Sequence, residues 1–184
     1  MQLVHLVIGL FICVTQSYAQ NLIPTPEVIN SFDGYFEHVN SKISVYMDDE
    51  AIVPVALLQS QLLNDVTITV SKHQANADIR FIKSTQIPHE GYQLTICSSY
   101  IEIVAADQAG FVYAIQTLRQ LQQSNKRKWN NVRILDRPRM KWRGFMLDSG
   151  RQFQSVATIK KYIDMASMLK MNIFHWHLTE GLGG

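Results

Sequence analysis

Residues 144–178 read GFMLDSGRQFQSVATIKKYIDMASMLKMNIFHWHL, and this stretch decides the fold of the second half of the chain. A short, nearly all-apolar run covers Gly144 to Asp148, and a second one covers residues 172–178. Between them, residues 155–171 have apolar side chains at helical spacing, and Ser155 stands where an N-cap belongs. The order strand, helix, strand predicts a βαβ unit, with two parallel strands buried on both faces.

The predicted helix of this unit is amphipathic. Its expected buried face consists of Val156, Ile159, Ile163, Ala166 and Leu169. A βαβ unit begins both open doubly wound sheets and (β/α)₈ barrels, so the pattern alone leaves both architectures open. One such unit cannot cover its own sheet, and we therefore expect the chain to be a truncated piece of a larger protein.

The preceding residues follow a different pattern, typical of an α/β layer domain with a mixed sheet and helices. Alternating runs predict strands at residues 34–39, 42–47, 66–70, 77–82, 92–97 and 100–105, and helical spacing predicts helices at residues 51–63 and 109–123. Residues 97–100 look like a hairpin turn. We expect this domain to span residues 20–136 and the βαβ part to span residues 137–184, because Pro138 and its charged neighbours break the pattern.

The first nineteen residues, MQLVHLVIGLFICVTQSYA, predict a signal peptide. The apolar run from Leu6 to Val14 is too short to span a bilayer, and Ala19 supplies a small residue at the cleavage site. We therefore expect export to the periplasm or the extracellular space. Cys13 suggests a lipoprotein, but the bulky Ile12 before it disfavours lipid attachment. Cys97 is then the only cysteine of the mature chain, and we expect it to be a buried structural thiol.

The composition is that of a globular protein and argues against nucleic-acid binding. The sequence is 47% apolar and 17% charged, as in a globular protein with a core, and its net charge is +2. Basic residues cluster only at Lys126, Arg127 and Lys128, which we expect to lie in a solvated loop. Nucleic-acid binding is not expected, because such proteins normally carry a basic stripe along one face.

The residues that carry chemistry follow the two strands of the βαβ unit. Parallel α/β folds bind ligands at the carboxyl ends of their strands, and those ends hold Asp148, Ser149, Arg151, His177 and Glu180. A guanidinium offers a rigid fork of donors to vicinal hydroxyls, and a nearby carboxylate can hold it in place. For Asp148 and Arg151, a salt bridge at the helix entrance is the structural alternative. Glu180 suits a supporting, orienting role.

His175 and His177 alternate with Trp176, so both imidazoles point to the same side of the strand. Such a pair can bind a metal in barrel hydrolases, which leaves a metal-dependent hydrolase open as one function. Beyond Glu180 the sequence offers no clear further ligand, and satisfied core histidines are the better interpretation. We expect neither a metal nor a cofactor.

Four segments resemble one known family. Residues 141–153 (KWRGFMLDSGRQF) and 169–180 (LKMNIFHWHLTE) are similar to the first two barrel strands of family 20 glycoside hydrolases. Residues 90–96 (EGYQLTI) and 109–121 (AGFVYAIQTLRQL) are similar to the α/β domain that precedes that (β/α)₈ barrel. The resemblance covers nearly the whole chain from Ile23 onward.

The resemblance implies an exo-acting β-N-acetylhexosaminidase that releases terminal N-acetylglucosamine or N-acetylgalactosamine from a glycan with retention. In this family the 2-acetamido oxygen of the substrate is the nucleophile. The catalytic Asp-Glu pair lies further along the family's sequence and is absent from residues 137–184, so we expect the fragment to be inactive.

Individual residues can be matched to the family pattern. Arg151 matches the arginine that binds sugar hydroxyls, and Asp148 matches the aspartate ahead of it. Glu180 falls where many members have aspartate, whereas Gln152 and Gly184 replace the usual histidine and tryptophan. A noncatalytic carbohydrate-binding or interaction module remains the rival from another class.

Overall fold

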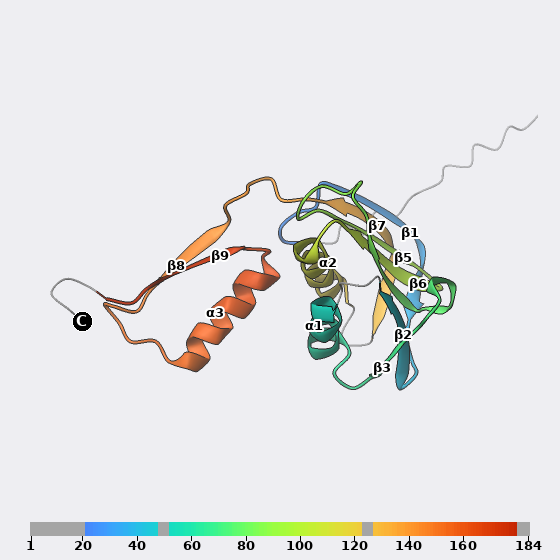
Figure 1. The fold of residues 1–184 in the computed structure, drawn as a ribbon, viewed down its shortest axis with the longest axis horizontal. Coiled ribbons are helices and arrows are strands. Elements are labelled where there is room, and N and C mark those ends of the chain that lie inside the picture. Colours follow the sequence, from blue (N-terminus) through green and yellow to red (C-terminus); the bar gives the residue numbers. More distant parts are fainter. Residues whose placement is uncertain (1–20, 48–51, 123–126, 180–184) are drawn as a thin grey trace, which may run out of the picture.

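The computed structural model describes residues 21–47, 52–122 and 127–179. They form an α/β domain and a βαβ unit that extends from one side of it (Figure 1). In chain order the elements are β1 (Val28–Glu37), β2 (Lys42–Met47), α1 (Ile52–Leu62), β3 (Thr67–Val70), a 3-10 turn (Gln74–Asn76), β4 (Ile79–Lys83), β5 (Tyr92–Cys97), β6 (Tyr100–Ala105), α2 (Gln108–Leu121), β7 (Lys128–Asp136), β8 (Gly144–Asp148), α3 (Val156–Met168) and β9 (Ile173–His177).

The α/β domain is built on a seven-stranded mixed sheet with the order β1-β7-β5-β6-β4-β2-β3. Strands β3, β2, β4 and β6 run parallel to their neighbours, and β5, β7 and β1 are added antiparallel. Cys97 pairs with Tyr100 across a tight turn, which confirms the predicted hairpin. The predicted mixed α/β class is likewise confirmed.

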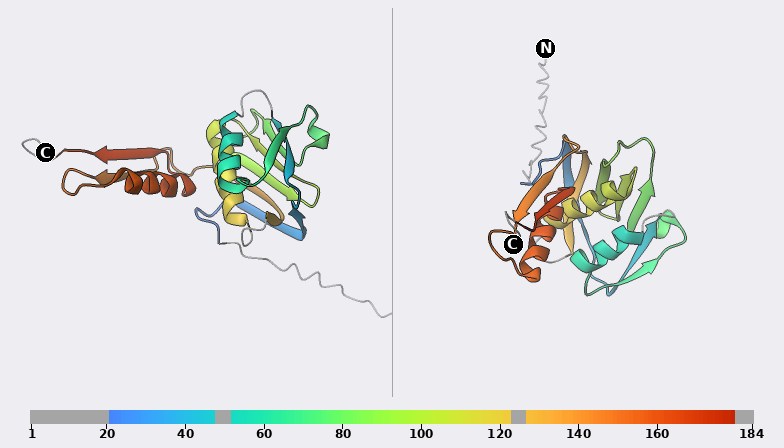
Figure 2. Two further views of the ribbon diagram at one scale, coloured as in Figure 1. Left: turned by 90° about the horizontal axis from the view of Figure 1, so that it is seen from below. Right: turned by 60° about the vertical axis from the view of Figure 1, so that its left-hand side comes forward.

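Helices α1 and α2 cover the face of this sheet that is turned toward the βαβ unit (Figures 1 and 2). The apolar residues whose helical spacing predicted α2 are all buried: Phe111, Ala114, Ile115, Leu118 and Leu121. The ring of Phe111 meets that of Phe81 edge to face at 5.6 Å between centroids. The Asp107 carboxylate caps α2 by accepting a hydrogen bond from the amide of Gly110. This helix is therefore fixed both on the sheet and at its start.

Strand β7 was not predicted, although it lies second from the edge of the sheet. The reason is a change of phase at Asn130 and Asn131: Trp129 and Val132 are both buried, three residues apart instead of two. The pairing with β1 is irregular at the same place, between Ser31 and Tyr35. The extra residues of this bulge lie in β1, and the change of phase opposite them in β7 removes the period of two on which strand prediction depends.

The basic cluster also differs from the expected solvated loop. Lys128 begins β7, and its ammonium group lies 3.6 Å from the centre of the Tyr35 ring. Arg127 donates a hydrogen bond to the carbonyl of Asn40, and its guanidinium lies 3.9 Å from the Asp65 carboxylate. Lys126 lies outside the described residues. Both side chains are held near the sheet, because a cation is attracted to the face of an aromatic ring and to a carboxylate.

Three further predictions concern cysteines and the leader. Cys97 is only partly buried, at the end of β5 on the side of the sheet away from the helices, so its prediction as a core thiol was wrong. The signal peptide and Cys13 lie outside the described residues. No helix in the described part of the chain is long and apolar enough to cross a membrane.

The βαβ unit has the predicted topology. Strands β8 and β9 are parallel, with Gly144 paired to Ile173 and Asp148 paired to His177. Ser155 caps α3 by accepting a hydrogen bond from the amide of Thr158. The Tyr162 ring of α3 lies 6.3 Å from that of Phe145, so the helix covers one face of the strand pair.

Within the described residues the strand pair is covered on one face only, as expected for a βαβ unit that cannot cover its own sheet. Met146 is 57% exposed and His175 is exposed, because no described element covers the face opposite α3. The predicted apolar face of α3 is also only partly used: Ile159 is buried, but Val156 and Ile163 are exposed. The unit is therefore held mainly through contacts near its junction with the α/β domain.

The close approach of α2 to the sheet gives a first testable prediction. An added Cβ at Gly110 would overlap the carbonyl oxygen of Gly91, a backbone atom that cannot rotate away. We expect Gly110→Ala to lower the free energy of unfolding by about 1–3 kcal/mol, although alanine favours helices. Urea unfolding measures the loss. The matched control is Gln108→Ala, at an exposed position of the same helix turn, which should change stability by less than about 0.5 kcal/mol; equal effects would contradict the predicted overlap.

Candidate functional site

The first polar cluster lies at the carboxyl ends of β8 and β9. The parallel register sets Asp148 beside His177, and the Nδ1 atom of His177 lies 3.6 Å from the Asp148 carboxylate. The amide of Ser149 donates to the carbonyl of His177 at 2.8 Å, so the two strand ends remain joined beyond the ladder. The structure thus brings together Asp148 and His177, which the alternation of the sequence had only placed on the same side.

Asp148 also orients the loop that carries Arg151. Its Oδ1 atom accepts hydrogen bonds from the amides of Gly150 at 3.0 Å and Arg151 at 3.2 Å, and its Oδ2 atom lies 3.4 Å from the Nε atom of Arg151. The Arg151 amide, together with the charges of His177 and Arg151, holds the pKa of the Asp148 carboxyl below its ordinary value. Asp148 is therefore a carboxylate at neutral pH.

The two side chains of this ion pair differ in exposure. The side chain of Arg151 is 75% exposed, whereas that of Asp148 is 25% exposed. An ion pair with so exposed a partner adds little to stability. The arrangement instead holds a guanidinium at the mouth of the strand ends, where its planar donors can meet pairs of hydroxyl oxygens. The contact is also the salt bridge that the structural alternative predicts, and the binding role of Arg151 stays a prediction.

The histidine pair gives no sign of a metal centre within the described residues. Among residues 21–47, 52–122 and 127–179, no group of three or more His, Cys, Asp and Glu side chains is placed to hold a metal ion. His175 and His177 do lie on one side of β9, as the alternation predicts. Glu180, the remaining predicted site residue, lies outside the described residues, so its supporting role stays a prediction.

A second polar cluster lies at the opposite ends of the same strands, where the βαβ unit meets the α/β domain. We call it the junction cluster; it consists of Glu90, Tyr92, Asp136, Arg143 and Lys170. The ammonium group of Lys170 lies 2.8 Å from both the Asp136 carboxylate and the Tyr92 hydroxyl. The side chains of Lys170 and Asp136 are 7% and 11% exposed. This ion pair is therefore almost fully removed from water.

Burial and charge shift the pKa values of Lys170 and Tyr92. Burial lowers the pKa of Lys170, and the Asp136 carboxylate opposes that shift without cancelling it. Burial, and then the charge of Asp136, raise the pKa of Tyr92 well above its ordinary value. The tyrosine therefore stays neutral and donates its proton to Asp136 at 3.0 Å.

The other half of the junction cluster is centred on Arg143. Its Nη1 atom lies 3.0 Å from the Glu90 carboxylate, and its Nη2 atom donates to the Tyr113 hydroxyl at 2.8 Å. Its Nε atom donates to the carbonyl of Lys170 at 2.8 Å, which links the two ion pairs. Burial would raise the pKa of Glu90, but the hydrogen bond and charge of Arg143 outweigh it and lower that pKa.

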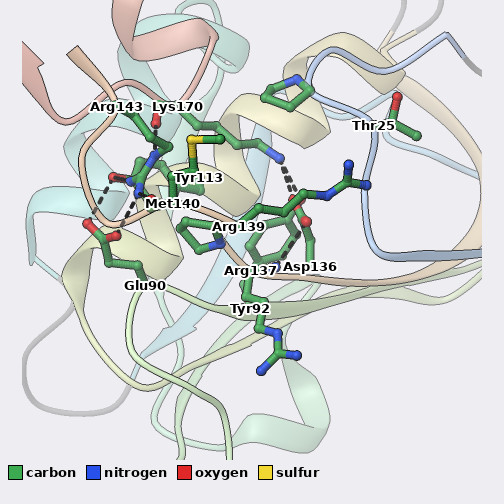
Figure 3. A pocket seen from close by; sticks show the side chains of 12 residues that line it. Thr25, Glu90, Tyr92, Tyr113, Asp136, Arg137, Arg139, Met140, Arg143 and Lys170 are labelled. Atoms are coloured by element: carbon green, nitrogen blue, oxygen red, sulfur yellow. Dashed lines mark hydrogen bonds and ion pairs between the residues drawn. The ribbon is translucent and has the colours of Figure 1, made fainter.

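A cavity of about 270 Å³ opens onto the junction cluster (Figure 3). The segment from Arg137 to Met140 forms one wall, and Tyr92 and Tyr113 contribute aromatic surface. Among the dashed contacts in Figure 3 are those that join Lys170 to Asp136 and Arg143 to Glu90, so four of the charged side chains beside this space are bonded in pairs. The cavity therefore belongs to the packing of the junction.

Sequence patterns missed the junction cluster. Its ion pairs join residues far apart in the chain; Asp136 and Lys170 are separated by 34 positions in sequence. One signal was present: Arg143 directly precedes β8, and Lys170 stands three positions before β9. A charged residue beside the start of a buried apolar strand costs free energy unless it is paired with an opposite charge.

Two family models match the chain in succession. Residues 19–137 match the model described as glycosyl hydrolase family 20, domain 2, and residues 140–183 match glycosyl hydrolase family 20, catalytic domain. Among curated relatives, a β-hexosaminidase of Porphyromonas gingivalis is 34% identical over 176 residues, which cover 87% of this chain and 22% of the relative. The chain thus spans less than a quarter of the length of that protein.

Solved structures give the same relationship. A β-N-acetylhexosaminidase from Bacteroides fragilis is 47% identical with a TM-score of 0.83, over 88% of this chain and 33% of that one. An exo β-N-acetylglucosaminidase from Vibrio harveyi, solved in complex with N-acetylglucosamine, is 28% identical with a TM-score of 0.77, over 89% of this chain and 26% of that one. The arrangement of the two parts is therefore shared with larger glycosidases.

The lowered pKa of Glu90 predicts how the junction responds to acid. A group with a lowered pKa stabilises the fold above its unfolded value, near 4.5, and loses that contribution as the pH falls through the folded value. We expect Glu90→Gln to cost about 1 kcal/mol at pH 7, because a charge-assisted hydrogen bond becomes a neutral one.

Urea unfolding of both proteins at pH 7 and near pH 3 measures this difference, which should shrink in acid. Glu102→Gln is the matched control, since Glu102 makes a 3.5 Å contact with Gln74 away from the junction, and its difference from wild type is measured at the same two pH values. A gap between wild type and Glu90→Gln that is unchanged near pH 3 would contradict the prediction.

Proposed function

The chain belongs to glycosyl hydrolase family 20, and we propose that it is the N-terminal part of an exo-acting β-N-acetylhexosaminidase. The proposed enzyme removes terminal N-acetylglucosamine or N-acetylgalactosamine from the non-reducing ends of glycans. The observation that carries this proposal is Arg151, which Asp148 holds at the carboxyl end of the first strand of the catalytic-domain segment. That is the edge at which (β/α)₈ barrels bind their substrates.

Each residue of the strand-end cluster has a proposed task. Arg151 donates hydrogen bonds to neighbouring hydroxyl groups of the terminal sugar. Asp148 keeps the guanidinium and the loop amides in position through its ion pair and two backbone hydrogen bonds. His177 lies beside the same carboxylate and supports its orientation. These are binding and orienting tasks, which suit side chains that are partly or largely exposed.

The bond-breaking step needs groups beyond these. In the proposed mechanism the 2-acetamido oxygen of the substrate attacks the anomeric carbon, and an Asp-Glu pair assists it. The only Asp-Glu dipeptide of this chain, Asp49-Glu50, precedes the βαβ unit by more than ninety positions in sequence. We therefore assign substrate binding, and not bond cleavage, to the residues of this chain.

Substrate class and location follow from separate observations. The Vibrio harveyi neighbour is named for its action on N-acetylglucosamine ends and was solved with that sugar, which supports the same substrate class here. The apolar run from Leu6 to Val14 and the small residues before Gln20 support export of the protein. Export would bring the enzyme to glycans outside the cytoplasm.

The proposed activity can be tested with paired substrates. We expect the full-length product of the reading frame to hydrolyse an aryl N-acetyl-β-glucosaminide and not the matching aryl β-glucoside, which lacks the acetamido nucleophile. Release of the aryl alcohol measures both reactions. The 184-residue chain alone should release none from either substrate. Equal rates on the two glycosides would exclude the substrate-assisted mechanism.

The role of Arg151 gives a further prediction. Replacing the planar fork with an ammonium group by Arg151→Lys should raise KM about tenfold or more, since one or two charge-assisted hydrogen bonds to the sugar are lost. Initial rates of the full-length enzyme on the aryl N-acetyl-β-glucosaminide measure it. Arg133→Lys is the control, because Arg133 bonds to Gln93 on the exposed face of the large sheet. An unchanged KM in Arg151→Lys would remove this residue from the binding site.

A further inference from the structure

The junction cluster and the strand-end cluster lie at the two ends of the same short strands. We propose that Lys170 and Arg143 are positioning residues: they fix the bases of β9 and β8 on the α/β domain and thereby set the positions of the sugar-binding groups at the far ends. The inference rests on the proposed function, because it assigns these two residues a task in substrate binding. They touch no substrate themselves.

The connection between the two ends is short and stiff. Both strands have five residues and are paired along their whole length, from Gly144 and Ile173 at the base to Asp148 and His177 at the end. At about 3.3 Å per residue, the base and the end are separated by roughly 13 Å. A tilt of the base is therefore passed directly to Asp148 and, through it, to Arg151.

The base itself is clamped at several points. The Asn172 side chain accepts a hydrogen bond from the Arg143 amide at 3.0 Å and donates to the carbonyl of Lys141 at 2.9 Å. It also reaches Glu90 of the α/β domain at 3.4 Å. Together with the Arg143 pairs, these contacts bind the starts of both strands to one carboxylate. These contacts therefore fix the position of the βαβ unit on the α/β domain.

Backbone conformation is a second, independent observation. Lys170 and Glu90 both have φ values of 59°, in the left-handed region where glycine is the usual residue. Lys170 ends α3 in this conformation, with its amide donating to the carbonyl of Ser167. Only the side chains explain lysine and glutamate there, and both side chains bind across the junction. Strain of this kind persists where the surrounding contacts require a particular residue.

The burial of the Lys170–Asp136 ion pair favours one position of the βαβ unit over others. Lys170 and Asp136 are nearly excluded from water, so any other placement of the βαβ unit would leave a buried charge without its partner. The Tyr92 hydroxyl accepts a hydrogen bond from Lys170 and donates one to Asp136. The Lys170 ammonium group also lies 4.9 Å from the centre of the Tyr92 ring. Displacements of the βαβ unit that lengthen these contacts are therefore disfavoured.

The test uses glycine substitution, because glycine relieves the left-handed backbone and removes only the side chain. We compare Lys170→Gly with Arg127→Gly in the 184-residue chain. Arg127 also has a positive φ, of 40°, but it lies away from the junction and contacts Asn40 and Asp65. Amide hydrogen exchange is followed in β8 and β9 and, as an internal reference, in β5 and β6.

We expect Lys170→Gly to speed exchange in β8 and β9 at least tenfold while β5 and β6 keep their wild-type rates. Arg127→Gly should leave β8 and β9 unchanged. Two results would overturn the proposal: unchanged exchange in β8 and β9, or an equal acceleration in all four strands, which is the signature of a general loss of stability. If Lys170→Gly does not fold, Arg143→Lys, which keeps the charge and loses the fork to Glu90 and Tyr113, is judged by the same criteria.

Kinetic constants of the full-length enzyme distinguish a displaced binding site from a general loss of folded protein. Loss of folded protein lowers the apparent kcat and leaves KM unchanged, whereas a displaced Arg151 raises KM. We expect both junction variants to raise KM for the aryl N-acetyl-β-glucosaminide at least fivefold, and an unchanged KM would overturn the proposal. If the wild-type enzyme has no activity, the proposed function fails, and the exchange data still decide whether Lys170 and Arg143 hold the strands.

Discussion

The placement of the βαβ unit on the α/β domain depends most on a buried ion pair, between Lys170 of that unit and Asp136 at the end of β7. Removing two charges from water costs several kcal/mol for each ion, so the pair is tolerated only because the geometry is close and Tyr92 adds further hydrogen bonds. Such a pair contributes specificity more than stability. It selects one placement of the βαβ unit and penalises every other.

The two ends of that unit consequently differ in character. At the base, Lys170, Arg143 and their partners are largely buried and bonded to one another. At the far end, Arg151 is mostly exposed, and its ion pair with Asp148 is too accessible to hold the fold together. Order at the strand ends therefore comes from the backbone ladder and from the base. A site arranged in this way can offer donors to a ligand without being needed for folding.

How much the sequence could predict depended on the range of each interaction. The paired strands β5 and β6 and the apolar face of α2 follow local periodicities and were predicted correctly. Asp148 and Arg151 are three residues apart, so their contact was also within reach. Strand β7 changes phase at Asn130, opposite the bulge in β1, and the pair of Asp136 with Lys170 leaves no periodic trace because its partners belong to different units. Sequence patterns therefore indicated the strand-end cluster and missed the junction cluster that supports it.

Strands β8 and β9, with the single helix α3, gain support from the α/β domain that precedes them. Two strands have little stability alone, and here one of their faces is exposed, as Met146 and His175 show. Contacts at the carboxyl ends would stabilise the pair but would cover the edge where ligands bind. Contacts at the bases leave that edge open. The junction cluster lies at the bases, so the α/β domain can stabilise the first two strands of the catalytic segment without obstructing the site that they carry.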